Sequence, residues 1–216
     1  MTDEPNPPEP VKPTADRIRD GAAELFRERG YGGTTTRALS AVAGIEKASL
    51  YHHVGGKEDL LYELCESTLK DVATVFQGAL QGGTDPLDTL ELLARRYVET
   101  ALVDRSRHAT MLTEIRSLSP GRRAEIVARR DENVAVVREV IEQAQESGSL
   151  RTDIDAKYLT LALFNLLNWS IFWFDPGGDL EPNEIGDILW TIYAHGAVRA
   201  DSPSAQGGDS RARSAT

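Results

Sequence analysis

The chain has 216 residues, of which 40% are hydrophobic and 27% charged, and a formal net charge of −10. This balance is that of an ordinary globular protein, and it excludes fibrous and wholly disordered classes. The single cysteine, Cys65, excludes a disulfide framework within the chain and suits a reducing compartment. We therefore expect a cytoplasmic protein in which Cys65 packs as a small buried residue.

The two ends of the chain differ from the rest in composition. Residues 1–12 are rich in proline and acidic residues, and residues 200–216 are rich in serine, glycine and charge. Neither stretch can bury enough apolar surface to offset the entropy lost on ordering, so we expect two disordered tails. The first lacks the features of a secretion signal, and the apolar stretch at 158–174 is too short and too polar to span a membrane, so no membrane partner is expected.

The N-terminal part predicts four helices. Apolar side chains recur with helical spacing over residues 14–30, and a glycine suited to ending a helix follows. The threonines at 34–36 are N-cap candidates for a second helix, which stops at Gly44. A third helix is expected over about 47–54, and a fourth begins at Lys57.

The rest of the chain predicts further helices and no strand. Glycine and proline separate amphipathic stretches at about 86–103, 107–117, 121–147, 155–174 and 184–198. The sequence thus predicts an all-α protein with a three-helix N-terminal domain, residues 13–60, and a larger C-terminal helical domain, residues 61–199.

Residues 35–61, TTRALSAVAGIEKASLYHHVGGKEDLL, have the pattern of a helix-turn-helix. Residues 43–45 supply a small residue and a turn glycine between two short helices, while Leu50 and Val54 hold the second helix on its domain. That helix is then able to enter a DNA major groove. Net charge adds no support, because residues 12–62 hold eight basic and seven acidic side chains.

These residues closely resemble the tetracycline-repressor (TetR) family of bacterial regulators over about residues 14–64. The family pattern appears here as Thr35 or Thr36, Ala43-Gly44-Ile45, Leu50-Tyr51-His52-His53-Val54 and Lys57-Glu58-Asp59-Leu60. Two positions depart from it: Glu46 stands where serine is common, and Ala48 where glycine is common. We expect Glu46 to cap the third helix, since it would repel a phosphate.

The resemblance implies DNA contacts from the second helix, the third helix and the start of the fourth. Lys47, Ala48 and Ser49 would meet base edges, and the others would mainly bind phosphate oxygens. Two of them have another interpretation, because Tyr51 can cover the first helix and Lys57 can be a solvated residue. The implied DNA-binding residues are Thr36, Arg37, Lys47, Ala48, Ser49, Tyr51, His52 and Lys57.

The resemblance also implies that the C-terminal part dimerises. The helix expected at 155–174 is apolar almost all round, and we expect it to form a two-fold interface with the helix at 184–198. A homodimer would place two recognition helices about one DNA turn apart, on a palindromic double-stranded operator. A ligand that favours the wrong separation would then release the operator.

The expected effector is a small hydrophobic molecule or an acyl-CoA thioester. The run of tryptophan and phenylalanine up to residue 174, followed by Pro-Gly-Gly, is similar to regulators that sense acyl-CoA. Arg116, Arg122 and Arg123 would meet a CoA phosphate or form a solvated rim, and each apolar candidate can equally be a core residue. The candidate ligand-binding residues are Met111, Leu112, Ile115, Arg116, Phe164, Asn168, Trp169, Phe172 and Trp173.

The sequence contains no catalytic elbow, phosphate-binding loop or zinc-ligand pair. We expect no enzyme activity, cofactor or metal. Adjacent His52 and His53 point about 100° apart on a helix, and His108 and His195 are interpreted as surface or satisfied core groups. The remaining alternative is a small-molecule carrier or interaction module that keeps this fold without binding DNA.

Overall fold

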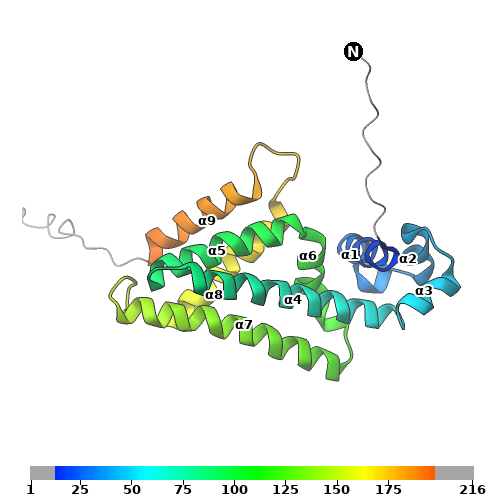
Figure 1. Ribbon diagram of the computed structural model, residues 1–216, viewed down its shortest axis with the longest axis horizontal. Coiled ribbons are helices and arrows are strands. Elements are labelled where there is room, and N and C mark those ends of the chain that lie inside the picture. Colours follow the sequence, from blue (N-terminus) through cyan, green and yellow to red (C-terminus); the bar gives the residue numbers. More distant parts are fainter. Residues whose placement is uncertain (1–12, 198–216) are drawn as a thin grey trace, which may run out of the picture.

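The computed structural model describes residues 13–197, so the tails expected at 1–12 and 200–216 lie outside it. Over this range the chain forms nine α-helices and one short 3-10 turn, with no strand. The molecule is elongated, and the three N-terminal helices lie at one end of it (Figure 1). The predicted all-α class is confirmed. None of the helices within 13–197 has both the length and the apolar character needed to cross a bilayer.

The N-terminal end is built from α1 (Thr14–Gly33), α2 (Thr36–Ala43), α3 (Lys47–His53) and the first turns of α4 (Lys57–Gly82). Helix α1 runs past its expected end, because Gly30 adopts a φ of 70° and bends the helix without stopping it. The buried Thr34 hydroxyl holds this bend by donating to the carbonyls of Leu25 (3.1 Å) and Gly30 (2.9 Å). Thr35 is the N-cap of α2, as the threonine pattern predicts, and its side chain accepts from the Ala38 amide.

The C-terminal part comprises α5 (Pro86–Val103), α6 (Arg105–Glu114), the 3-10 turn η1 (Ile115–Ser117), α7 (Pro120–Glu146), α8 (Ala156–Trp173) and α9 (Pro182–Ala197). The predicted stretches agree with these helices to within two residues at each end. One difference is that the stretch at 107–117 divides into α6 and η1. Proline in the first turn of α5 and α7 suits a helix start, since the missing N–H has no partner there.

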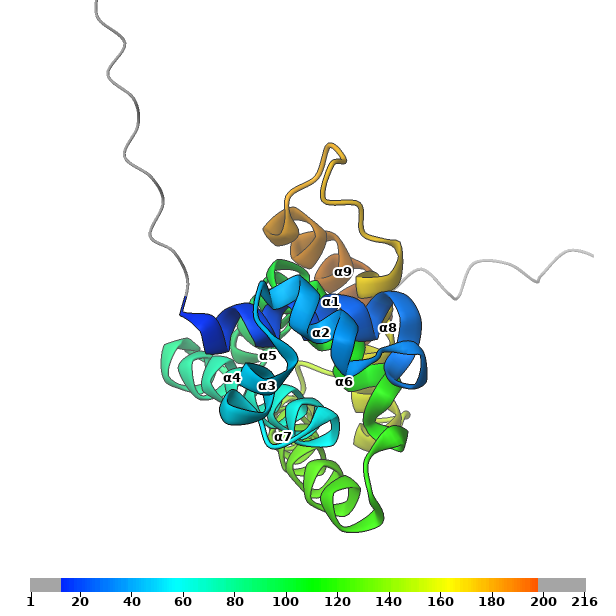
Figure 2. The same cartoon turned by 90° about the vertical axis from the view of Figure 1, so that its right-hand side faces the viewer.

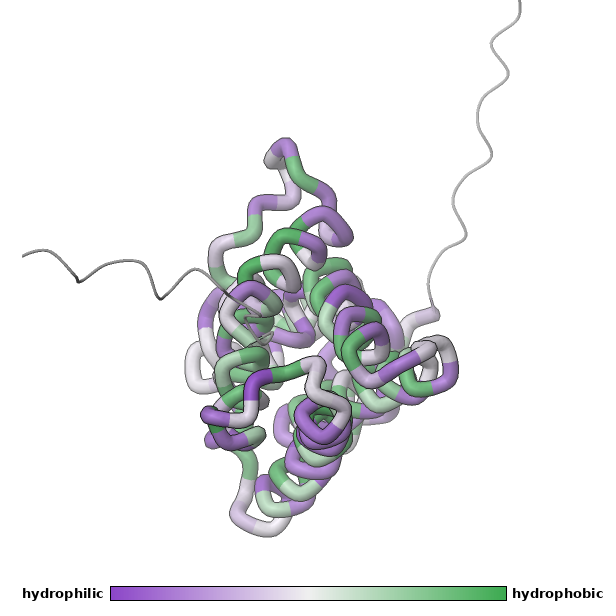
Figure 3. Tube along the Cα trace, turned by 90° about the vertical axis from the view of Figure 1, so that its left-hand side faces the viewer, coloured by the Kyte–Doolittle hydropathy of each residue, from purple (hydrophilic) through white to green (hydrophobic). Residues whose placement is uncertain are grey.

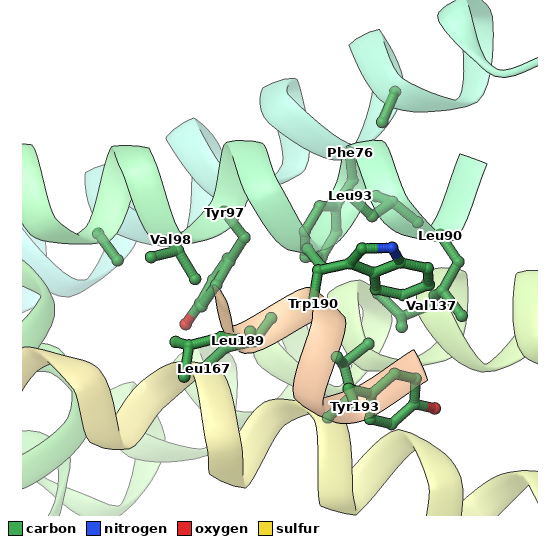
Figure 4. Packing of buried hydrophobic residues seen from close by; sticks show 14 of the residues in the cluster. Phe76, Leu90, Leu93, Tyr97, Val98, Val137, Leu167, Leu189, Trp190 and Tyr193 are labelled. Atoms are coloured by element: carbon green, nitrogen blue, oxygen red, sulfur yellow. The ribbon is translucent and has the colours of Figure 1, made fainter. Parts of the chain in front are cut away.

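Two hydrophobic clusters stabilise the fold. The first joins α1 to α4, and it also includes Met111, Leu118 and Ile126 from the C-terminal part. The second fills the bundle of α4, α5, α7, α8 and α9, where side chains such as Leu93, Tyr97, Leu167 and Trp190 converge (Figure 4). Hydrophobic and hydrophilic residues alternate around the helices that enclose it (Figure 3).

Helix α4 runs without a break through the predicted domain boundary at 60/61. The first cluster also continues past it, through Leu61, Leu64 and Cys65. The boundary stays a prediction, and α4 and its buried side chains belong to both parts of the molecule. Cys65 is buried as expected, and burial raises the pKa of its thiol to about 12.

Candidate nucleic-acid interface

The turn between α2 and α3 depends on one glycine. Gly44 adopts the left-handed conformation, with φ 66° and ψ 37°, and its amide donates back into the last turn of α2. The amide of Ile45 donates to the Ser40 carbonyl at 3.0 Å. A side chain at position 44 would meet no atom within 4 Å, so glycine is favoured there by conformation and not by space.

Helix α3 is anchored on one side and open on the other. Leu50, on its inner side, is 2% exposed, and Val54, which follows the helix, is 5% exposed. The rest of α3 consists of five exposed residues and the half-buried Ser49, and α3 lies next to α2 at the end of the molecule (Figure 2). The exposed residues are the predicted DNA contacts Lys47, Ala48, Tyr51 and His52, together with His53.

The side chains of Tyr51 and Glu46 both point to solvent. Tyr51 is 49% exposed, so the interpretation in which it covers α1 finds little support. Glu46 is the N-cap residue of α3, as expected from its position, but its side chain makes no capping hydrogen bond. The expected cap interaction is therefore wrong, and Glu46 stays exposed beside the face that carries Lys47.

The start of α2 contributes the remaining polar contacts. Thr36 is half-buried in the first turn, and Arg37 is exposed. Arg37 forms no ion pair within residues 13–197, so its charge is available to a phosphate. These two residues and the α3 face lie on consecutive elements of the helix-turn-helix.

Lys57 has a structural contact that the sequence does not reveal. Its ammonium donates to the carbonyls of Tyr31 (2.8 Å) and Thr34 (2.9 Å), and lies 4.0 Å from the centre of the Tyr31 ring. It is therefore not the freely solvated residue of the alternative interpretation. One of its three N–H donors remains for a phosphate oxygen.

Helix α6 connects the N-terminal helices with the C-terminal bundle. The Thr110 hydroxyl donates to the Ala23 carbonyl of α1 at 3.1 Å, and Arg107 lies 3.4 Å from Asp20. On its other side, Arg105 Nε donates to the Ile171 carbonyl of α8 at 2.7 Å. Helix α6 is therefore in direct contact with both α1 and α8.

The nine candidate ligand-binding residues occupy three environments. Met111 is buried in the first cluster, Ile115 packs against that cluster, and Leu112 contacts both clusters. Phe164 lines a small cavity of about 10 Å³ in the second cluster, beside Tyr97. The exposed members are Arg116, Trp169, Phe172 and Trp173. The set is thus not gathered around one open pocket.

Asn168 and Arg122 already have partners in the fold. The Tyr97 hydroxyl donates to Asn168 Oδ1, which ties α5 to α8. Arg122 forms ion pairs with Asp59 and Glu58 in the first turn of α4, and these raise its pKa. Of the three arginines considered for a CoA phosphate, Arg116 and Arg123 are the exposed ones.

An apolar surface runs along α8 and α9. The exposed side chains on α8 include Trp169, which is 66% exposed and packs against Phe172 with ring centres 5.1 Å apart and the rings tilted by 47°. Exposed large apolar side chains in such a stripe mark an interaction surface. The stripe consists of Tyr158, Leu161, Trp169, Phe172 and Trp173 on α8, with Ile188 and Ile192 on α9.

His108 differs from its expectation. It is 2% exposed, but its Nε2 has no hydrogen-bond partner, so it is a core residue that is only partly satisfied. It lines a groove between α4, α5 and α6. No sequence signal reveals this groove, since its walls come from helices that meet only in the tertiary structure.

Comparison with known proteins agrees with this architecture. Residues 18–64 match bacterial regulatory proteins of the tetR family, and residues 83–197 match the tetracyclin repressor-like C-terminal domain. The HTH-type transcriptional repressor KstR2 of Rhodococcus jostii RHA1 is 28% identical over 180 residues, which cover 83% of this chain and 88% of KstR2.

Two solved structures are similar over nearly their whole length. The ketosteroid transcriptional regulator KstR2 of Mycobacterium tuberculosis superposes with a TM-score of 0.82 and 26% identity, covering 88% of this chain and 97% of KstR2. AibR in complex with isovaleryl coenzyme A and operator DNA gives a TM-score of 0.74 and 27% identity, covering 83% of this chain and 97% of AibR. With a family match that spans more than half of its length, the chain belongs to the TetR family of bacterial DNA-binding transcriptional regulators.

Proposed function

We propose that the protein is a transcriptional repressor that binds a palindromic operator as a homodimer and is released by a small hydrophobic or acyl-CoA-type effector. The observation that supports this most is the α3 face, which is anchored by Leu50 and exposes Lys47, Tyr51 and His52. A rigid helix with an exposed polar face is what entry into a major groove requires.

Base reading and phosphate binding are assigned to different residues. Lys47, Ala48 and Ser49 begin α3, the part of a recognition helix that reaches base edges. The Ala48 methyl group suits contact with a thymine methyl. Phosphate contacts, which set register and supply most of the affinity, are assigned to Thr36, Arg37, Tyr51, His52 and the free donor of Lys57.

The α8 and α9 stripe supports a two-fold dimer. Because each α8 presents a row of aromatic and aliphatic side chains, a second copy would remove this surface from water. Because Trp169 and Trp173 are exposed, we assign them to this dimer interface and not to an effector pocket. Two copies of α3 would then read the two halves of a palindrome.

Repression and effector release rest on the relatives. KstR2 is named a repressor, and AibR is solved with isovaleryl coenzyme A and operator DNA. An acyl group would enter beside Leu112, which contacts both clusters, between Met111 and Ile115 of the first cluster and Phe164 of the second, with Arg116 or Arg123 near the CoA phosphates. Release follows if the effector binds more tightly to the arrangement in which the two α3 helices are wrongly spaced.

The DNA-binding proposal is tested with an operator selected from random duplexes. Fluorescence anisotropy over a salt series should give a log affinity that falls by about 0.9 per phosphate contacted for each unit of log salt. Arg37→Ala should reduce this slope, whereas Arg138→Ala, an exposed arginine on α7, should leave it unchanged. A flat salt dependence, or failure to select any sequence, would contradict the proposal and favour the carrier alternative.

The effector is tested with isovaleryl-CoA, longer acyl-CoA thioesters, free CoA and the matching free acids. We expect an acyl-CoA to raise the melting temperature by binding the folded state and to release the operator at the same concentration. Free CoA should do neither. If no acyl-CoA or hydrophobic metabolite changed operator binding, the proposed effector class would be wrong. The DNA-binding proposal would remain intact.

A further inference from the structure

A groove of about 510 Å³ opens between α4, α5 and α6, apart from every residue assigned above to DNA or to the effector. Helix α4 and the end of α5 form its walls, and α6 contributes His108. The residues that matter for its chemistry are Asp71, Arg96, Glu99, Asp104 and His108.

His108 lines this groove and carries a buried hydrogen-bond acceptor that has no partner. Its Nδ1 lies 3.3 Å from the carbonyl oxygen of Asp104, and since a carbonyl only accepts, Nδ1 must carry the proton. Burial lowers the pKa of the imidazole, so the ring is neutral near pH 7 and Nε2 presents a lone pair. Nε2 is buried and has no partner, which costs free energy until a donor is supplied. The Tyr97 ring, edge-on at 6.1 Å, holds the imidazole in place.

Two carboxylates that line the groove form no ion pair among the described residues. Asp71 and Glu99 are exposed, and neither forms an ion pair within the described part of the chain, whereas Asp104 is paired with Arg107 at 3.2 Å. Arg96 also lines the groove, but its side chain extends along α4 away from Asp71. Its guanidinium lies next to Gly78, 3.3 Å from the position that a Cβ atom would take there, two helical turns beyond Asp71. One end of the groove is therefore acidic and rich in acceptors.

We propose that this groove is a binding site for an organic ammonium ion, which donates to His108 Nε2 and lies beside Asp71 and Glu99. An ammonium supplies both the missing donor and the missing positive charge. A metal ion is a poorer occupant, because no group of three or more His, Cys, Asp or Glu residues within 13–197 is arranged to hold one. The site requires neither DNA nor a second subunit.

The first experiment compares benzylammonium, benzyl alcohol and benzoate, which share a ring and differ in the head group. Isothermal titration calorimetry on the full chain at pH 7.5, without DNA, should show benzylammonium binding at least about tenfold more tightly than the other two. The ¹⁵N resonance of His108 Nε2 should shift on binding. Equal binding of the alcohol, preferential binding of benzoate, or no binding at all would overturn the proposal.

The second experiment uses a double variant at two exposed positions, which should fold normally, and one variant of the buried His108. Asp71→Asn with Glu99→Gln should weaken benzylammonium binding about three- to tenfold, as expected for the loss of two exposed ion pairs. Glu132→Gln, an exposed carboxylate on α7 outside the groove, is the matched control and should not change it. His108→Phe keeps an aromatic ring and removes the acceptor, so it should abolish the preference for the ammonium over the alcohol. Unchanged binding in the double variant would place the ligand elsewhere.

Discussion

Lys57, the first residue of α4, lies with its ammonium 4.0 Å from the centre of the Tyr31 ring, at the end of α1. Two carbonyls, that of Tyr31 in the last turn of α1 and that of Thr34 just after it, accept hydrogen bonds from the same group. The end of α1, the residue that follows it and the start of α4 therefore meet at one charged side chain. In the linear sequence this residue looks like an ordinary helix-start lysine available to a phosphate.

This contact predicts a separation between stability and DNA binding. Lys57→Met should lower the free energy of unfolding by about 1–3 kcal/mol, because two carbonyls lose a charged donor. Arg37→Ala, at an exposed position without an ion pair in the described residues, should change it by less than about 0.5 kcal/mol and still weaken operator binding. Urea unfolding and anisotropy measure the two quantities. If Lys57→Met were as stable as the native protein, the contacts of Lys57 with Tyr31 and Thr34 would make no contribution to folding stability.

Gly44 and Gly121 form a matched pair for the role of backbone conformation. Neither has an atom within 4 Å of the place where a side chain would begin, but Gly44 has a φ of 66°. Gly44→Ala should therefore cost about 1–2 kcal/mol, the penalty of the left-handed region for a residue with a side chain. Gly121→Ala, in the first turn of α7, should be neutral or stabilise by up to about 1 kcal/mol. Equal effects of the two changes in thermal unfolding would exclude strain at the turn.

Local patterns were enough to predict the helices and the turn that places α3 at the surface. Helix periodicity, the Thr35 cap and the glycine at 44 act over a few residues, so the sequence displays them directly. The environments of Asn168, Trp169 and His108 were not predictable in this way. Asn168 accepts a hydrogen bond from Tyr97, 71 positions earlier in the chain. The sequence pattern of an apolar residue on α8 is also the same whether its side chain faces the core or another subunit.

Trp169 tests the proposed dimer surface. Its side chain is 66% exposed on the α8 stripe, so Trp169→Glu should place a charge in the interface and convert the protein to a monomer at micromolar concentration. Leu80→Glu, at an exposed apolar position on α4, should leave the oligomeric state unchanged. Sedimentation velocity distinguishes the two. If the Trp169→Glu protein sedimented like the native protein, α8 would not form the dimer interface.

His108 should make stability depend on pH. Desolvation lowers its pKa below the ordinary 6.5, outweighing the nearby Asp104 and Asp71, while Arg107 acts in the same direction as desolvation. The unfolded chain therefore binds the proton first, so this contribution is fully present above about pH 6.5 and is lost as the pH falls toward the lower folded pKa. Thermal unfolding between pH 7.5 and 5 should show a smaller loss of stability for His108→Phe than for the native chain.

The control for this measurement is His53→Asn, which removes an exposed histidine at the end of α3 and should retain the native pH dependence. The comparison isolates burial as the cause, because the two histidines differ mainly in their access to water. If His108→Phe and the native chain lost stability in parallel over this range, the imidazole would not be held neutral by its surroundings. Its Nε2 would then be unavailable as the acceptor that the groove requires.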